Sequence, residues 1–279
     1  MGRHRGNKRH RFSGVRGCAL LAILMALAIL VIPPLRRAVY QWLPCLPELP
    51  ELPGFLTLAD QPTAGQPTSI QPEEWDEAMA PNYYRVAGPA DFDAMSAIGV
   101  VMYSPLDALG RAGKVLACVD ANLCAYGSSR ERVDMSNLEP SGWGYNEEAD
   151  IVLPTGNVYH GYFWNRSHLL AKSLGGEEVE ENLVCGTRMQ NVGANLNGTE
   201  GGMAYCETIV RKWLEQNPNG YVLYSATPVY RAEELVCRNV IVDIHTSDGS
   251  IDQQVVVYNA AKGYSIDYAT GRFAKAAAP

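Results

Sequence analysis

Near neutral pH, histidine is the side chain best able to take or give a proton, and this sequence has few histidines beyond its first ten residues. They are His160, His168 and His245. His160 and His245 each fall inside a strand-like pattern, so we interpret both as structural. His168 differs because it ends the run WNRSH (residues 164–168), where a strand pattern gives way to a helical one. A lone histidine is more often structural than catalytic. Whether His168 is catalytic must therefore be judged from the residues that follow it.

Amide and charged side chains follow His168 in a defined order. Asn182 opens the run NLVCGT (residues 182–187), and Asn191 comes four residues after that run ends. Glu207 and Arg211 then lie four residues apart on a predicted helix, so they share one of its faces. Taken alone, this last pair is best interpreted as a surface ion pair worth roughly 0.2–0.5 kcal/mol.

The order of these pieces resembles the bacterial DNA/RNA non-specific endonucleases, in particular the membrane-anchored nucleases of DNA uptake and related secreted DNases. Members of that family carry Asp-Arg-Gly-His, or Asn-Arg-x-His in one branch. Next come Asn-Leu/Ile-x-x-x-Thr-x-x-x-Asn and a helix with Glu and, one turn later, Arg. The matching pieces here are residues 165–168, residues 182–191, and Glu207 with Arg211. The resemblance covers most of residues 85–275, including the runs at 106–111, 140–143 and 266–271.

This resemblance implies a ββα-metal (His-Me) finger that hydrolyses phosphodiester bonds. His168 would be the general base that takes a proton from water. Asn191 would bind a single Mg²⁺, with Mn²⁺ as a substitute, because Mg²⁺ prefers oxygen ligands and keeps several of its waters. Glu207 would hold those waters, and Arg211 would contact the metal-bound phosphate. The implied catalytic set is His168, Asn191, Glu207 and Arg211, of which Asn191 and Glu207 belong to the metal site.

Several positions depart from the family pattern or leave alternatives open. Asn165 replaces the commoner Asp, and Ser167 replaces Gly. Glu200 is the nearest alternative to Glu207, because the loop after Asn191 varies in length within the family. The residues expected to contact the substrate are Arg132, Asn165, Arg166 and Asn182. For Arg132, a solvated loop charge is an equally good interpretation.

The elements that must position these residues follow from hydrophobic periodicity. Alternating or short apolar runs predict strands at residues 98–103, 114–119, 157–164, 221–229, 235–246 and 253–258. Apolar residues at three- and four-residue spacing predict a helix over 203–216. A short helix is expected over 167–173, and loops are expected over 127–144 and 191–202. Mixed order with consecutive strands indicates an α+β fold with a central antiparallel sheet and flanking helices.

Charge is unevenly distributed along the 279 residues. The formal net charge is −7, but residues 1–17 hold six Lys or Arg and no acid. The remainder therefore has 17 basic and 30 acidic groups, a charge of −13. So acidic a domain is a poor candidate for blanket adhesion to nucleic acid. A polyanionic substrate would have to be met by a local basic patch or by a bound cation.

The N-terminal part predicts export and anchoring. Residues 17–35 contain no charge and would rise about 28 Å as a helix, close to the ~30 Å thickness of a bilayer core. We expect a basic cytoplasmic tail at 1–17, an uncleaved transmembrane signal anchor at 18–35, a Pro-rich acidic linker at 36–80 and a nuclease domain at 81–279. A cleaved signal peptide is the alternative, and it would make the protein secreted.

Seven cysteines are present, of which Cys18 lies in the apolar segment. The other six would lie in an oxidising compartment, where an even number suggests disulfides. Six cysteines allow 15 pairings, and only the close pair Cys118 and Cys124 suggests a specific bridge.

Taken together, the sequence predicts a single-pass cell-membrane protein whose extracellular domain is a Mg²⁺-dependent, sequence-non-specific endonuclease. Its substrate would be DNA, with RNA left open, and no small-molecule cofactor is expected. The alternatives are a non-catalytic surface module that binds nucleic acid or protein on the same fold, and a hydrolase for another phosphodiester.

Overall fold

The computed structural model describes residues 71–276. The basic tail, the apolar segment 18–35, Cys45 and the linker as far as residue 70 lie outside the described residues. Within residues 71–276, no helix combines the length and the apolar character needed to cross a bilayer.

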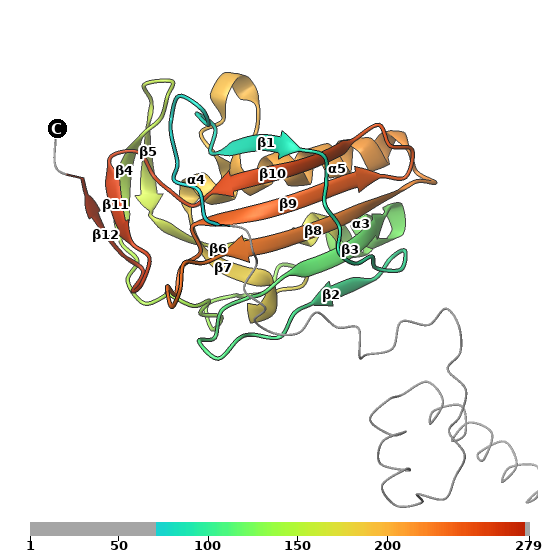
Figure 1. Ribbon diagram of the computed structural model, residues 1–279, viewed down its shortest axis with the longest axis horizontal. Coiled ribbons are helices and arrows are strands. Elements are labelled where there is room, and N and C mark those ends of the chain that lie inside the picture. The colour runs from blue at the N-terminus through green and yellow to red at the C-terminus, as the bar shows by residue number, and fades with distance from the viewer. Residues whose placement is uncertain (1–70, 277–279) are drawn as a thin grey trace, which may run out of the picture. The chain divides into compact units, whose positions relative to one another are not determined.

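A six-stranded sheet forms the centre of the described domain, in the order β1-β10-β9-β8-β3-β2, and all neighbouring strands are antiparallel (Figure 1). Its strands are β1 (Tyr84–Gly88), β2 (Val101–Tyr103), β3 (Val115–Asp120), β8 (Tyr221–Val229), β9 (Asn239–Thr246) and β10 (Asp252–Tyr258). Three separate hairpins are formed by β4 (Glu148–Val152) with β5 (Val158–Tyr162), β6 (Trp164–His168) with β7 (Leu183–Thr187), and β11 (Tyr264–Asp267) with β12 (Arg272–Lys275).

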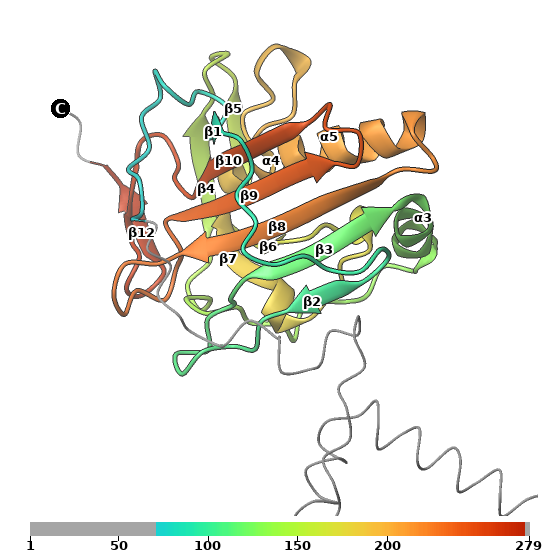
Figure 2. The ribbon, with the colours of Figure 1, turned by 45° about the vertical axis from the view of Figure 1, so that its right-hand side comes forward.

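Three α-helices accompany the described strands: α3 (Ala121–Ser129), α4 (Arg188–Val192) and α5 (Gly202–Gln216). Figures 1 and 2 show α4 and α5 on the same face of the sheet, behind it in both views. Short 3₁₀ turns add η2 (Lys172–Leu174), η3 (Glu180–Asn182) and η4 (Leu196–Gly198).

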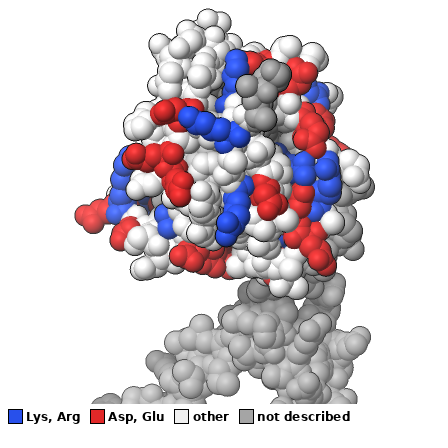
Figure 3. Space-filling model, turned by 90° about the vertical axis from the view of Figure 1, so that its left-hand side faces the viewer, with Lys and Arg blue, Asp and Glu red and all other residues white. Residues whose placement is uncertain are grey.

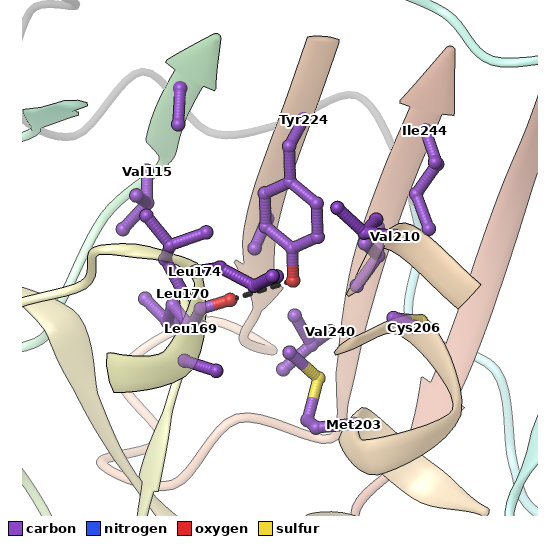
Figure 4. Packing of buried hydrophobic residues seen from close by; sticks show 14 of the residues in the cluster. Val115, Leu169, Leu170, Leu174, Met203, Cys206, Val210, Tyr224, Val240 and Ile244 are labelled. Carbon is purple, nitrogen blue, oxygen red and sulfur yellow. Dashed lines mark hydrogen bonds between the residues drawn. The ribbon is translucent and has the colours of Figure 1, made fainter. Parts of the chain in front are cut away.

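The main core lies between the sheet and α5. Met203, Cys206 and Val210 of α5 are fully buried against Tyr224 and Ile244 of the central strands (Figure 4). Burying a large apolar side chain is worth about 1.5–3 kcal/mol, so this face holds α5 firmly in place. The segment that follows His168 joins the same core through Leu169, Leu170 and Leu174.

The opposite face of the sheet is covered by the start of the described chain. Ala80 and Trp75 pack against Ile241 and Val256, and the Trp75 ring stacks on Tyr83 at 4.6 Å. Residues 73–80, which the sequence predicts to be the end of the linker, therefore pack on the domain.

Several expected elements are confirmed, and some differ. The helix at 203–216 and the strand at 221–229 appear as α5 and β8. The short helix expected over 167–173 is wrong: residues 167 and 168 belong to strand β6, and only the 3₁₀ turn η2 follows. The loop expected over 127–144 overlaps the end of α3, which runs to Ser129, and the loop expected over 191–202 overlaps the end of α4. The expected Cys118–Cys124 bridge is also wrong, because both thiols are free.

Candidate active site

The β6–β7 hairpin and α4 form one continuous ββα unit. β6 pairs antiparallel with β7, placing Asn165 opposite Gly186 and His168 opposite Leu183. β7 then leads directly into α4, where the Thr187 hydroxyl accepts a hydrogen bond from the Gln190 N–H at 2.8 Å and caps the helix. The ββα arrangement that the resemblance implied is therefore present.

Glycine at position 186 allows α4 to lie close to the hairpin. A Cβ at this position would overlap the buried Gln190 side chain and the Cβ of Ser167. Because residue 186 has no side chain, Ser167 can occupy a fully buried position where the family commonly has Gly.

Asn191 on α4 is hydrogen-bonded to two side chains of β6. Its Nδ2 donates to Asn165 Oδ1 at 3.0 Å, and its Oδ1 accepts from the Ser167 hydroxyl at 3.3 Å. Alternate residues of a strand face the same side, so Asn165 and Ser167 meet the helix together. The structure thus brings Asn191 onto the strand that ends at His168.

The His168 imidazole is largely enclosed and keeps a free nitrogen. Its Nε2 is buried and has no hydrogen-bond partner among residues 71–276. Burial lowers the pKa of His168; the Glu178 carboxylate opposes this effect and Arg130 adds to it. The neutral ring, which is the form that can accept a proton, is therefore favoured at neutral pH.

Arg130 and Glu178 form an ion pair near His168 that sequence reasoning missed. Arg130 Nη1 lies 3.5 Å from Glu178 Oε2, and the Glu178 side chain is only 8% exposed. Arg130 also donates to the Gly176 carbonyl and lies over the Tyr126 ring at 5.3 Å. Glu178 stands in an acidic run and Arg130 in a polar loop, so neither gave a spacing signal.

Asn182, which the sequence predicts to contact substrate, holds the loop that follows His168 and has no exposed surface. It is fully buried, its Oδ1 accepts from Leu170 N–H at 2.9 Å, and its Nδ2 donates to the carbonyls of Leu170 and Glu177. The Tyr224 hydroxyl fixes the same loop by donating to the Leu169 carbonyl at 2.8 Å (Figure 4). The role of Asn182 is to position the backbone next to His168.

Helix α5 carries Glu207 and Arg211 towards this region. It packs against α4, the helix of the ββα unit, and against η2, which lies in the loop between β6 and β7. Burial raises the pKa of Glu207 to about 7, although Arg211 opposes the rise. No ion pair joins these two residues within the described chain; Arg211 Nη2 donates instead to Thr208 Oγ1 at 3.2 Å. Glu207 and Arg211 therefore do not form the simple surface ion pair that their spacing alone suggested.

The remaining expected residues lie in different settings. Arg166 is held by the Leu138 and Ser136 carbonyls, at 2.5 and 3.1 Å, and stacks over Trp143, so it ties a surface loop to β6. Arg132 is exposed in that loop. Glu200 lies in the turn before α5, where its carbonyl accepts from Asn82.

The charged groups on one face of the domain are mixed in sign. Figure 3 shows Lys and Arg interspersed with Asp and Glu on the face near β4, β5, β11 and β12. No broad basic field covers this face, which agrees with the acidic composition.

Comparison with known proteins gives a consistent result. The sequence pattern of the DNA/RNA non-specific endonucleases matches residues 95–248. A deoxyribonuclease of Streptococcus dysgalactiae subsp. equisimilis is 32% identical over 236 residues, which is 73% of this chain and 71% of that protein.

Solved structures of nucleases are also similar to this chain. The Sda1 nuclease with bound zinc ion is 33% identical with a TM-score of 0.68, over 73% of this chain and all of that one. NucA from Streptococcus agalactiae with magnesium bound shares the fold, with a TM-score of 0.53 at 23% identity, over 68% of this chain and 84% of that one. The matched range contains the whole ββα unit and α5. The chain therefore belongs to the DNA/RNA non-specific endonuclease family and is a nuclease.

Proposed function

We propose that this protein is a membrane-anchored, Mg²⁺-dependent endonuclease that hydrolyses phosphodiester bonds of DNA outside the cell. The observation that carries the proposal is the enclosed, neutral His168 with its unpartnered nitrogen, which directly follows in sequence the two β6 residues, Asn165 and Ser167, that bind Asn191. RNA is a second substrate to be tested in the same assay.

The residues present fit a divalent ion. Asn191 Oδ1 accepts one hydrogen bond and keeps a second lone pair. The Glu207 carboxylate has no hydrogen bond or ion pair with another described residue. Oxygen donors are what Mg²⁺ and Mn²⁺ prefer, and the zinc and magnesium in the two related structures support a divalent ion in this family. When bound, such an ion supplies charge neutralisation to the phosphate and to the departing 3′ oxygen.

Each residue of the site would then have a separate role in the hydrolysis. Neutral His168 takes the proton from the water that attacks phosphorus. Arg211, steadied by Thr208, offers a guanidinium to the phosphate oxygens. Asn191 would hold the ion directly, whereas Glu207 would accept hydrogen bonds from the waters around it.

Anchoring and location are supported by the N-terminal sequence. A basic tail before an uncharged stretch that would rise about 28 Å as a helix favours a cytoplasmic N-terminus and an external domain. Fractionation of cells, followed by protease treatment of intact cells, tests this proposal. Recovery of the full chain in the soluble cytoplasmic fraction would contradict it.

The nuclease proposal is tested by plasmid degradation with Mg²⁺, with EDTA, and with the His168→Ala variant. Loss of a general base is expected to lower the rate about 10²–10⁴-fold, and EDTA to abolish it. His160→Ala is the matched control, because His160 is exposed, lies outside the ββα unit on β5, and pairs with Asp150 on β4 at 2.6 Å. Activity that survives both EDTA and His168→Ala would refute the mechanism.

A metal titration separates the two metal-site residues. Asn191→Ala is expected to raise the Mg²⁺ concentration needed for half-maximal activity more than Glu207→Gln does, because Asn191 would contact the ion and Glu207 only its waters. The reverse order would show that the roles are assigned wrongly.

A further inference from the structure

The side-chain amide of Asn191 can present either of two atoms to its surroundings. Turning the amide by about 180° exchanges Oδ1, which binds a cation, with Nδ2, which cannot. A residue that holds a metal ion through an amide therefore needs neighbours that fix which atom faces the ion.

Two neighbours on β6 are placed to do this. Asn165 accepts from Nδ2 at 3.0 Å and Ser167 donates to Oδ1 at 3.3 Å, so both ends of the amide are held. Ser167 is fully buried and fits only because residue 186 is glycine. Asn165 is half-buried and lies across from Gly186 in the register.

The chemistry of these neighbours leaves the orientation only partly fixed. The amide of Asn165 and the hydroxyl of Ser167 can each donate or accept, so the same pair of bonds can form around a turned Asn191. A carboxylate at position 165 could only accept, and it would hold Nδ2 in place by itself.

We propose that Asn165 and Ser167 are positioning residues that set the amide orientation of Asn191 and thereby the affinity of the site for a divalent cation. This inference rests on the proposed metal role of Asn191. It replaces the substrate-contact role that the sequence suggested for Asn165.

Direct cation binding tests the inference without any need for activity. Mn²⁺ is the probe, and free Mn²⁺ is counted by electron paramagnetic resonance during titration of the metal-free protein. Asn165→Ala and Ser167→Ala are each expected to weaken Mn²⁺ binding about 10- to 100-fold. Asn165→Asp is expected to bind at least as tightly as the parent chain. Thermal unfolding in EDTA checks that each variant is folded.

A double-mutant cycle separates orientation from added charge. If the carboxylate introduced by Asn165→Asp fixes the amide alone, Ser167→Ala should weaken Mn²⁺ binding little in the Asn165→Asp background and about tenfold or more in the parent chain. If the carboxylate acts only through its charge, the cost of Ser167→Ala should be the same in both backgrounds, which would overturn the inference.

Asn191→Ala distinguishes this inference from the proposed function. If Asn191→Ala leaves Mn²⁺ affinity unchanged, the metal role of Asn191 itself fails. If Asn191→Ala weakens binding but neither Asn165→Ala nor Ser167→Ala does, the metal site stands and the positioning role is wrong.

Discussion

The raised pKa of Glu207 gives a stability prediction that can be worked out from the structure. Burial raises this pKa from 4.5 to about 7, and a tenfold change in proton affinity corresponds to about 1.36 kcal/mol. Ionised Glu207 therefore costs the metal-free fold roughly 3 kcal/mol. Glu207→Gln removes that cost, because a neutral amide of similar shape replaces the carboxylate.

The direction of the pH dependence follows from which state of the chain, folded or unfolded, keeps the proton on Glu207. Between pH 4.5 and 7 the folded chain keeps a proton on Glu207 that the unfolded chain releases, so this residue's contribution to stability falls as pH rises through that range. Below pH 4.5 the parent and Glu207→Gln should be equally stable. Above pH 7 the variant should be more stable by about 3 kcal/mol, while being less active.

Urea unfolding in EDTA at pH 4, 6 and 8 measures this difference. Glu215→Gln is the matched control, since Glu215 is exposed on the same helix and should change stability little at any pH. The reasoning would be refuted if Glu207→Gln raised the free energy of unfolding by the same amount at pH 4 and pH 8, or did not raise it at pH 8. Adding Mg²⁺ should reduce the gain, because a bound cation would stabilise the parent's carboxylate.

Three further outcomes are expected. Asn182→Ala should lower the free energy of unfolding by about 2–4 kcal/mol in urea titration, because it leaves buried backbone groups of the loop unpaired; an unchanged midpoint would contradict its structural role. Glu178→Gln removes the carboxylate that raises the pKa of His168, so the acid limb of the pH profile of kcat/KM should move to lower pH, whereas a shift to higher pH would oppose this assignment. Gly186→Ala should destabilise the domain by about 1–3 kcal/mol through overlap with Gln190 and Ser167, and calorimetry showing an unchanged Tm would mean that α4 tolerates the added methyl.

Sequence patterns predict best the elements whose apolar residues repeat regularly over a long stretch. Residues of α5 such as Cys206, Val210 and Trp213 recur on one face, and Asn219-Gly220 ends that pattern, so the predicted helix agrees with α5 to within a residue. The central strands β8 and β10 are predicted equally well, because their buried runs are bounded by turn residues.

Elements that are held in place by contacts with distant parts of the chain are not predicted by such patterns. Helix α3 has Gly127 in its last turn, where a Cβ would overlap the Lys172 carbonyl, so close packing against η2 and not a helical pattern explains that residue. Helix α4 has only five residues, too few for a periodic signal. The sequence pattern puts His168 at a helix start, whereas pairing with Leu183 keeps it in β6.

The sequence indicates which residues lie in the candidate site better than it indicates what each of them does there. The motif contains Asn165 and Asn191, and the structure brings these two side chains into contact. It cannot show that Asn182 is fully buried, since a motif does not distinguish a residue that touches substrate from one that holds a backbone. Arg130 lies far from His168 in sequence, and only the folded chain brings the two together.

The loop between His168 and Asn182 is fastened where it begins and where it ends. The Leu169 N–H donates to the Asn182 carbonyl at 2.8 Å, and the Asn182 Oδ1 accepts from the Leu170 N–H at 2.9 Å, so these hydrogen bonds close the base of the loop. Doubling the length of such a closed loop costs only about 0.6 kcal/mol in chain entropy. Added length alone would therefore cost little chain entropy, but Leu174 is buried in the main core and Glu178 raises the pKa of His168, so an inserted segment leaves the histidine undisturbed only if it keeps both residues in place.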